Sequence, residues 1–174
     1  MWDATVFGVY NDNFPLYIKH EDLSEIVHGG QCLSIFVIEL WILHMTETSM
    51  RAGNADVYGF LEPQSIQRSG QSQFESESYI KNWMQNSRRD VYLGAYLNGA
   101  HWQMIVILPK ENVVIWFCSL NNRPDNYLKG IINNFKNNWK TYFNDARPLE
   151  PERLKALRIQ WAKFYLKVKN ETVS

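Results

Sequence analysis

Cysteine is scarce in this sequence, which has only Cys32 and Cys118 in 174 residues. A structural zinc site needs four ligands in closely spaced pairs, and a disulfide framework needs several cysteines at regular intervals. Histidine is also sparse, at four residues. The sequence therefore predicts neither a metal centre nor a disulfide-stabilised fold, and no motif in it indicates a cofactor.

An excess of charge of either sign is also missing. The 18 basic and 18 acidic side chains give a formal net charge of zero. Nucleic acids, anionic membranes and acidic substrates attract proteins through a field that this composition does not supply. We therefore expect neither nucleic acid nor membrane as a partner.

The N-terminal stretch MWDATVFGVYNDNF has neither a basic segment nor an uninterrupted apolar run. These are the marks of a signal peptide and of a membrane span. The pattern predicts an intracellular protein, in the nucleus or the cytoplasm.

Aromatic and aliphatic residues are plentiful. Hydrophobic residues make up 45% of the chain, with seven Trp, nine Tyr and nine Phe. This composition is typical of a packed globular protein, and the length favours a single domain with a real core.

Three apolar runs predict neighbouring strands, at residues 91–97, 101–108 and 113–120. They are rich in β-branched and aromatic residues and are bounded by turn formers. The second and third runs are apolar at nearly every position, so both faces of the sheet must be covered. This pattern predicts an α+β fold, with central antiparallel strands flanked by helices.

The spacing of the last two runs predicts their register. If residues 109–112 form the loop, Gln103 lies opposite Cys118 and His101 lies opposite Leu120. Opposed residues share a face, so His101 and Cys118 become diagonal neighbours, about 7–8 Å apart between backbones. The imidazole and the thiol form a candidate site.

The same residues resemble the ubiquitin-like-protein-specific (SUMO-type) cysteine protease domain, a papain-like fold. The motifs that carry the likeness are His101-Trp102, two hydrophobic strands at Ile105–Leu108 and Val113–Phe117, and Cys118-Ser119-Leu120. The resemblance implies that His101 is the catalytic base and that Trp102 contributes to binding. It implies an Asp at position 118 to orient the imidazole, where this chain has a cysteine.

The thiol of Cys118 is a poor substitute for that carboxylate. A thiol with a reference pKa of about 8.5 is mostly neutral near pH 7 and accepts hydrogen bonds weakly. We interpret Cys118 as a small buried hydrophobe in the place of a lost acid.

The family's nucleophile, a Cys before Gly, and its oxyanion Gln should both follow the Asp motif. No cysteine follows Leu120, and Gln160 has no Cys-Gly within reach, so the resemblance assigns it no role. The likeness covers residues 16–161, after a lead-in at 1–15 and before a divergent tail at 162–174. The chain resembles a C-terminally truncated, diverged copy of the kind found in plant transposable elements.

Cys32 is an alternative nucleophile. It follows Gly-Gly-Gln at the expected start of a buried helix, where the helix dipole would lower the pKa of a thiol. Asn121 or Asn122 would then orient the imidazole, in the Cys, His, Asn order of ordinary papain-like proteases. Against this, Gln31 directly precedes the cysteine, and the resemblance makes the helix structural, with Asp22-Leu23 and Cys32-Leu33 at family motif positions.

The remaining elements follow from periodicity and turn signals. We expect a short strand after residue 16, a helical turn at 22–27, a buried helix at 32–46, a polar loop at 46–54, a strand at 57–61, a helical turn near Ile66, a helix at 75–86, a long helix at 125–142 capped by Asp125, a break at 144–148, a segment at 151–157 and a strand at 158–164.

The function implied by the resemblance is hydrolysis of isopeptide or C-terminal peptide bonds at the Gly-Gly end of a ubiquitin-like modifier such as SUMO. Since the nucleophile and the acid are missing, we predict negligible peptidase activity. The competing prediction is a noncatalytic binding module, in which a groove beside Trp102 holds the modifier's extended tail.

Overall fold

The structure is a computed structural model that describes residues 19–120, 122–133 and the backbone of 139–141, with Glu152, Lys155, Ala156, Arg158, Ile159, residues 161–164 and Leu166. Its elements are α1 (His20–His28), α2 (Ile35–Arg51), β1 (Tyr58–Phe60), the 3₁₀ turn η2 (Gln64–Ile66), α3 (Gln73–Ser87), β2 (Val91–Asn98), β3 (His101–Leu108), β4 (Val113–Phe117), α4 (Asn126–Asn133) and β5 (Trp139–Thr141). The predicted lead-in, the break at 144–148, the end of the tail, Asn121 and Gln160 lie outside the described residues.

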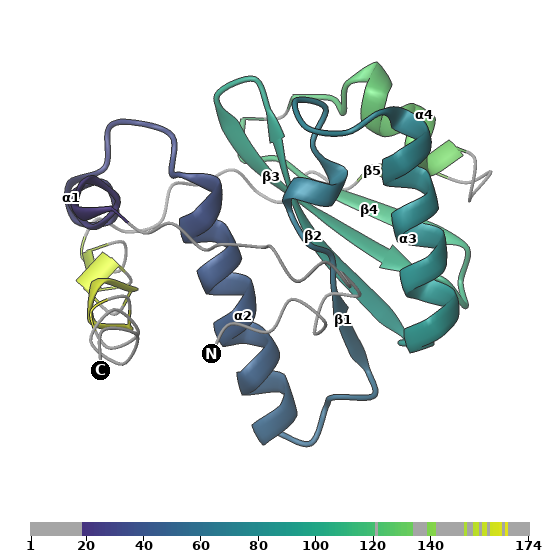
Figure 1. Cartoon of the computed structure of the whole chain (residues 1–174), viewed down its shortest axis with the longest axis horizontal. Coiled ribbons are helices and arrows are strands. Elements are labelled where there is room, and N and C mark those ends of the chain that lie inside the picture. Colours follow the sequence, from purple (N-terminus) through teal and green to yellow (C-terminus); the bar gives the residue numbers. More distant parts are fainter. Residues whose placement is uncertain are drawn as a thin grey trace.

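The sheet has five strands in the order β1-β2-β3-β4-β5 (Figure 1). The central β2, β3 and β4 are antiparallel, and β1 and β5 join the two edges in parallel. Leu108 pairs with Val113 and Met104 with Phe117, so the predicted hairpin register is confirmed. Asn112 has φ 55°, a left-handed conformation that Asn tolerates in a tight turn.

Helices cover both faces of the sheet, as the continuous apolar runs predict. On one face, α3 and α4 bury Ile80, Leu128 and Ile131 against Tyr92 and Trp116. On the other face lies α2 (Figure 1), which contributes Ile38 and Ile42 to a cluster with Phe60, Leu93 and Trp102. The predicted α+β class is confirmed.

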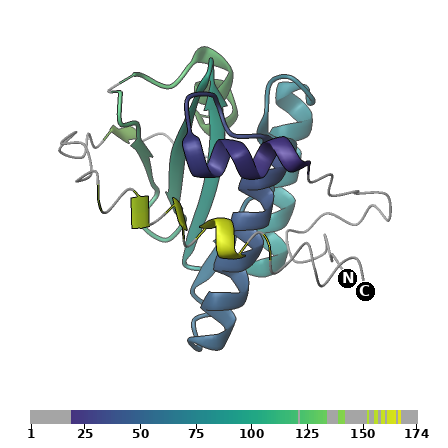
Figure 2. The ribbon, with the colours of Figure 1, turned by 90° about the vertical axis from the view of Figure 1, so that its left-hand side faces the viewer.

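A third layer lies outside α2. Ile26 of α1 packs with Val37 and Leu40 of α2, and Trp161, Ala162 and Phe164 join the same cluster. Residues 161–164 are helical, so the strand predicted at 158–164 is wrong. The packing explains the error, because Trp161 and Phe164 lie one helical turn apart and face the same cluster. Figure 2 shows this segment, in yellow, beside α1.

Two further boundaries differ from the prediction. The α2 helix continues to Arg51 through residues expected to form a loop, and the Thr46 hydroxyl donates to the Ile42 carbonyl at 2.9 Å within it. The end of α2 is mostly exposed, so it carries no apolar stripe from which a helix could be predicted. The predicted long helix at 125–142 ends at Asn133, and Trp139–Thr141 instead pairs with β4. This strand covers an edge of β4 that would otherwise lack partners.

The other predicted elements are found with small shifts. The strand at 57–61 is β1, the helical turn near Ile66 is η2, and the helix at 75–86 is α3 with a capping box between Ser72 and Glu75. The turn at 22–27 extends into the nine-residue α1. Asp125 caps α4, because its Oδ1 accepts a hydrogen bond from the Leu128 amide at 2.8 Å.

Candidate functional site

His101 opens β3, directly after a two-residue turn at Gly99 and Ala100. Asn98 and His101 are paired across this turn, and Gly99 has φ 66°, which glycine adopts at little cost. The side chain is half-buried. Its Nε2 lies 3.1 Å from the Ser119 hydroxyl oxygen, a hydrogen-bonding distance. The imidazole of the candidate base is therefore hydrogen-bonded to Ser119.

Cys118 lies on the predicted face but has other partners. It is 4% exposed and belongs to the core cluster that includes Trp116. The Gln103 side-chain amide donates to its Sγ at 2.9 Å, and the Asn122 backbone amide donates at 3.3 Å. The predicted opposition of Gln103 and Cys118 is thus confirmed, and the thiol is occupied by these two donors.

The predicted strand to Leu120 is wrong, because β4 ends at Phe117. The chain turns at this point, since Asn122 bonds to the Cys118 sulfur and its carbonyl accepts the Trp116 indole N–H at 3.2 Å. Leu120 is 60% exposed and does not continue the strand opposite His101. The turn brings Ser119, rather than Cys118, to the imidazole.

This arrangement limits what His101 can do. A hydroxyl fixes the ring but carries no charge to stabilise an imidazolium, which a carboxylate does in Cys-His and Ser-His enzymes. The sequence alone did not indicate Ser119, because on a regular strand position 119 would point to the opposite face. Only the early end of β4 reveals the contact.

Trp102 points to the α2 face of the sheet. Its indole N–H donates to the Leu33 carbonyl at 2.9 Å, which fixes the loop before α2 onto the start of β3. The ring lines a mainly apolar cavity of about 320 Å³ between α2 and the sheet. Other lining residues include Ile38, Trp41, Met45, Met104 and Trp161. This cavity lies beside Trp102, where the sequence predicts a groove.

Cys32 lies in the loop before α2 and is not in its first turn. Ser34 is the N-cap residue, and its hydroxyl accepts the Phe36 amide at 3.3 Å. Cys32 is largely exposed, yet the pKa of its thiol is raised, first by the part of it that is buried and then by the Glu25 carboxylate, although the nearby Trp102 side chain opposes the shift. The expected lowering of this pKa by the helix dipole is therefore wrong.

The positions of Trp102 and His101 also separate Cys32 from the candidate base. Adjacent residues on a strand point to opposite faces, so Trp102, beside Cys32, faces α2 while His101 faces the α3 and α4 side. Asn122, one of the two proposed orienters, uses its backbone amide and carbonyl to close the turn after β4. Among the described residues, no hydrogen bond joins Cys32 to His101.

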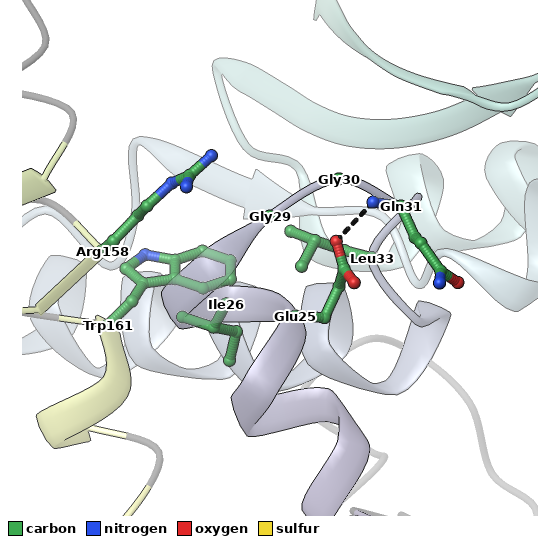
Figure 3. A pocket seen from close by; sticks show the side chains of 8 residues that line it. All are labelled: Glu25, Ile26, Gly29, Gly30, Gln31, Leu33, Arg158 and Trp161. Atoms are coloured by element: carbon green, nitrogen blue, oxygen red, sulfur yellow. Dashed lines mark hydrogen bonds between the residues drawn. The ribbon is translucent and has the colours of Figure 1, made fainter.

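A second cavity, of about 300 Å³, lies between α1, the loop at 29–33 and the C-terminal helical segment (Figure 3). The Glu25 carboxylate accepts the Gln31 amide at 2.7 Å there, and Arg158 donates to the His28 carbonyl at 2.8 Å. Trp161 and Leu33 form its apolar wall. His28 and Arg158 are far apart in the sequence, so no local sequence pattern predicts this cavity.

In the described part of the chain, no set of three His, Cys, Asp or Glu side chains is placed to hold a metal ion. Within that same part, every helix is too short or too polar to cross a membrane.

Comparison with known proteins identifies the fold. No protein-family model matches the sequence, and no curated protein matches it. Among solved structures, the chain is similar to SUMO protease Ulp1 with its catalytic cysteine oxidised to a sulfinic acid, at 12% identity and a TM-score of 0.53, over 86% of this chain and 73% of that one. It is similar to a de-sumoylating protease at 13% identity and a TM-score of 0.57, over 90% of this chain and 71% of that one.

A further Ulp1 structure, with a sulfonic acid at the catalytic cysteine, matches at 11% identity and a TM-score of 0.53, over 91% of this chain and 78% of that one. The α+β architecture of this chain is therefore that of a cysteine protease of the SUMO-protease type. The fold expected from His101-Trp102 and the two strands that follow is confirmed, and identities this low establish the fold alone.

Proposed function

We propose that this chain is a noncatalytic module of the SUMO-protease type, which binds the C-terminal tail of a ubiquitin-like modifier and does not cleave it. The observation that carries the proposal is the separation of the imidazole from both thiols. His101 bonds to Ser119, Cys118 is buried under Gln103 and Asn122, and Cys32 lies by Trp102.

Acyl transfer by a cysteine peptidase requires a thiolate next to an imidazolium, with donors for the oxyanion. The raised pKa of Cys32 favours its neutral thiol near pH 7, which is the less nucleophilic form. Cys118 is 4% exposed, so an extended peptide cannot reach its sulfur without opening the core. Both cysteines therefore lack the surroundings of a nucleophile.

Binding does not depend on those groups. The cavity beside Trp102 offers apolar and aromatic walls from α2 and β3, and an extended tail gains affinity from such contacts and from its backbone hydrogen bonds. The solved structures with this fold include proteases that act on SUMO, by their descriptions. SUMO is therefore the modifier to test first, and its flexible Gly-Gly tail is the segment that we place beside Trp102.

Isothermal titration of SUMO into the full chain tests this proposal. We expect saturable binding of SUMO with its Gly-Gly tail, and affinity weaker by about tenfold or more after deletion of the tail or after Trp102→Ala, because a buried aromatic anchor carries much of the energy of an interface. Phe74→Ala is the matched control, since Phe74 is 75% exposed on α3 and lies outside the cavity.

Trp102 also holds the Leu33 carbonyl, so Trp102→Phe is needed as a second variant that keeps an aromatic ring beside the cavity and removes the indole donor. Circular dichroism establishes that each variant is folded. Equal affinity for SUMO with and without its tail, or no heat of binding at all, would rule out the proposed module.

A further inference from the structure

We infer that Ser119 is the residue that positions His101, in place of Cys118. The contact between Ser119 and the imidazole is present in the free protein, so it goes beyond the proposed function and does not require that a modifier binds.

The end of β4 at Phe117 sets the two neighbouring side chains apart. Cys118 keeps the inward direction of Val114 and Trp116 and joins their core cluster. Ser119 falls in the turn that follows the strand, and it is exposed. Because the chain no longer alternates as a strand there, residue 119 reaches the imidazole instead of pointing to the opposite face.

The two hydrogen-bond donors at the Cys118 sulfur are Gln103 and Asn122, and not His101. Gln103 lies two residues from His101 on β3, on the same face of the sheet as Cys118, and its amide nitrogen is 2.9 Å from Sγ. The Asn122 amide approaches the same sulfur at 3.3 Å. A side chain at position 118 is thus directed at Gln103 and at the turn, so restoring a carboxylate there would place it against these donors and not against His101.

The contact to Ser119 fixes one ring nitrogen. Its Oγ lies 3.1 Å from Nε2 of His101, and the hydroxyl can donate to or accept from that nitrogen. Nδ1 has no hydrogen-bond partner in the part of the chain that the structure describes. With Nε2 held by Ser119, Nδ1 is the ring nitrogen left to exchange a proton or a hydrogen bond with a bound group.

The test is ¹⁵N NMR of the imidazole nitrogens in the full chain, with His101→Gln used to assign the signals. In the wild type we expect Nε2 of His101 to show the shift of a hydrogen-bonded nitrogen. Ser119→Ala should move this shift, because the partner of Nε2 is lost, and Ser119→Thr should restore the wild-type value because the hydroxyl is kept. Cys118→Ala should leave the His101 signals unchanged.

Carboxylate variants give a second readout. In Ser119→Asp, the carboxylate can only accept a hydrogen bond, so His101 should hold its proton on Nε2 and show one dominant tautomer. Cys118→Asp buries a charge and can fail to fold, so Cys118→Ser is its partner variant, and neither should change the nitrogen signals of His101. Unchanged signals in Ser119→Ala, or a change in Cys118→Ala or Cys118→Ser, would overturn the inference. Neither outcome depends on whether SUMO binds.

Discussion

At the scale of single residues, Glu39 has an unusual environment. Its side chain is fully buried on α2 and accepts a hydrogen bond from the Gln64 side chain at 2.7 Å. Burial is the main reason that its pKa is raised to about 8, the Gln64 bond opposes the shift, and the nearby Glu62 carboxylate adds to it. Glu62 in turn accepts the Gln64 and Ser65 amides at 2.7 and 2.6 Å, so it holds the turn after β1.

The sign of the pH effect follows from the raised pKa. An unfolded Glu has a pKa of about 4.3, so the stabilisation from protonated Glu39 is fully present below that pH and is lost as the pH rises through about 8. We predict that the free energy of unfolding falls between pH 5 and pH 9. Glu39→Gln should flatten this dependence and be roughly 1–3 kcal/mol more stable than wild type at pH 9.

Urea unfolding at pH 5, 7 and 9 measures this effect. Glu111→Gln is the control, because Glu111 is an exposed residue in the β3–β4 loop and should leave the pH dependence intact. Parallel pH profiles for wild type and Glu39→Gln would mean that Glu39 is ionised in the folded protein.

At the scale of elements, Asp125 joins a helix to the sheet. One carboxylate oxygen caps α4 by accepting the Leu128 amide at 2.8 Å, and the other accepts the Tyr96 hydroxyl of β2, also at 2.8 Å. The pKa of Tyr96 is raised, first by burial and then by its bond to Asp125. The carboxylate therefore stabilises both the start of α4 and its attachment to β2.

We predict that Asp125→Ala lowers the free energy of unfolding by about 2–3 kcal/mol, since it removes a cap and leaves a buried hydroxyl without its acceptor. Tyr96→Phe should cost about 1 kcal/mol, because it removes only the second bond. Denaturant unfolding of both single variants and the double variant measures their coupling. Strictly additive losses would show that the Tyr96 bond contributes nothing.

The sequence predicts elements best where local signals act alone. The hairpin register follows from loop length, the α3 helix from its periodicity, and the α4 cap from Asp125 after Pro124. The predictions fail where distant contacts decide. The local pattern predicts a helix through Trp139, which instead pairs as a strand with the edge of β4. It predicts a strand at Trp161, which instead lies in a helical segment packed on α2.

At the scale of the whole molecule, the sheet separates two candidate sites. His101 with Ser119 lies on the α3 and α4 side, while Trp102 and its cavity lie on the α2 side. The sequence predicts that His101, Gln103 and Cys118 share a face, because strand alternation is a local rule. It does not predict the contact between Ser119 and His101, because that contact depends on where β4 ends. Nor does it predict the raised pKa of Cys32, because that depends on how α1 packs beside the loop before α2.

The intact mass of the full chain after incubation with SUMO carrying a C-terminal vinyl sulfone tests the central claim most directly. This electrophile captures a cysteine that is activated beside the tail-binding site. We predict that the chain keeps its unmodified mass, while a SUMO protease treated in parallel is fully labelled. An adduct on Cys32 or Cys118 that disappears in His101→Ala would contradict a noncatalytic module and establish an active thiol.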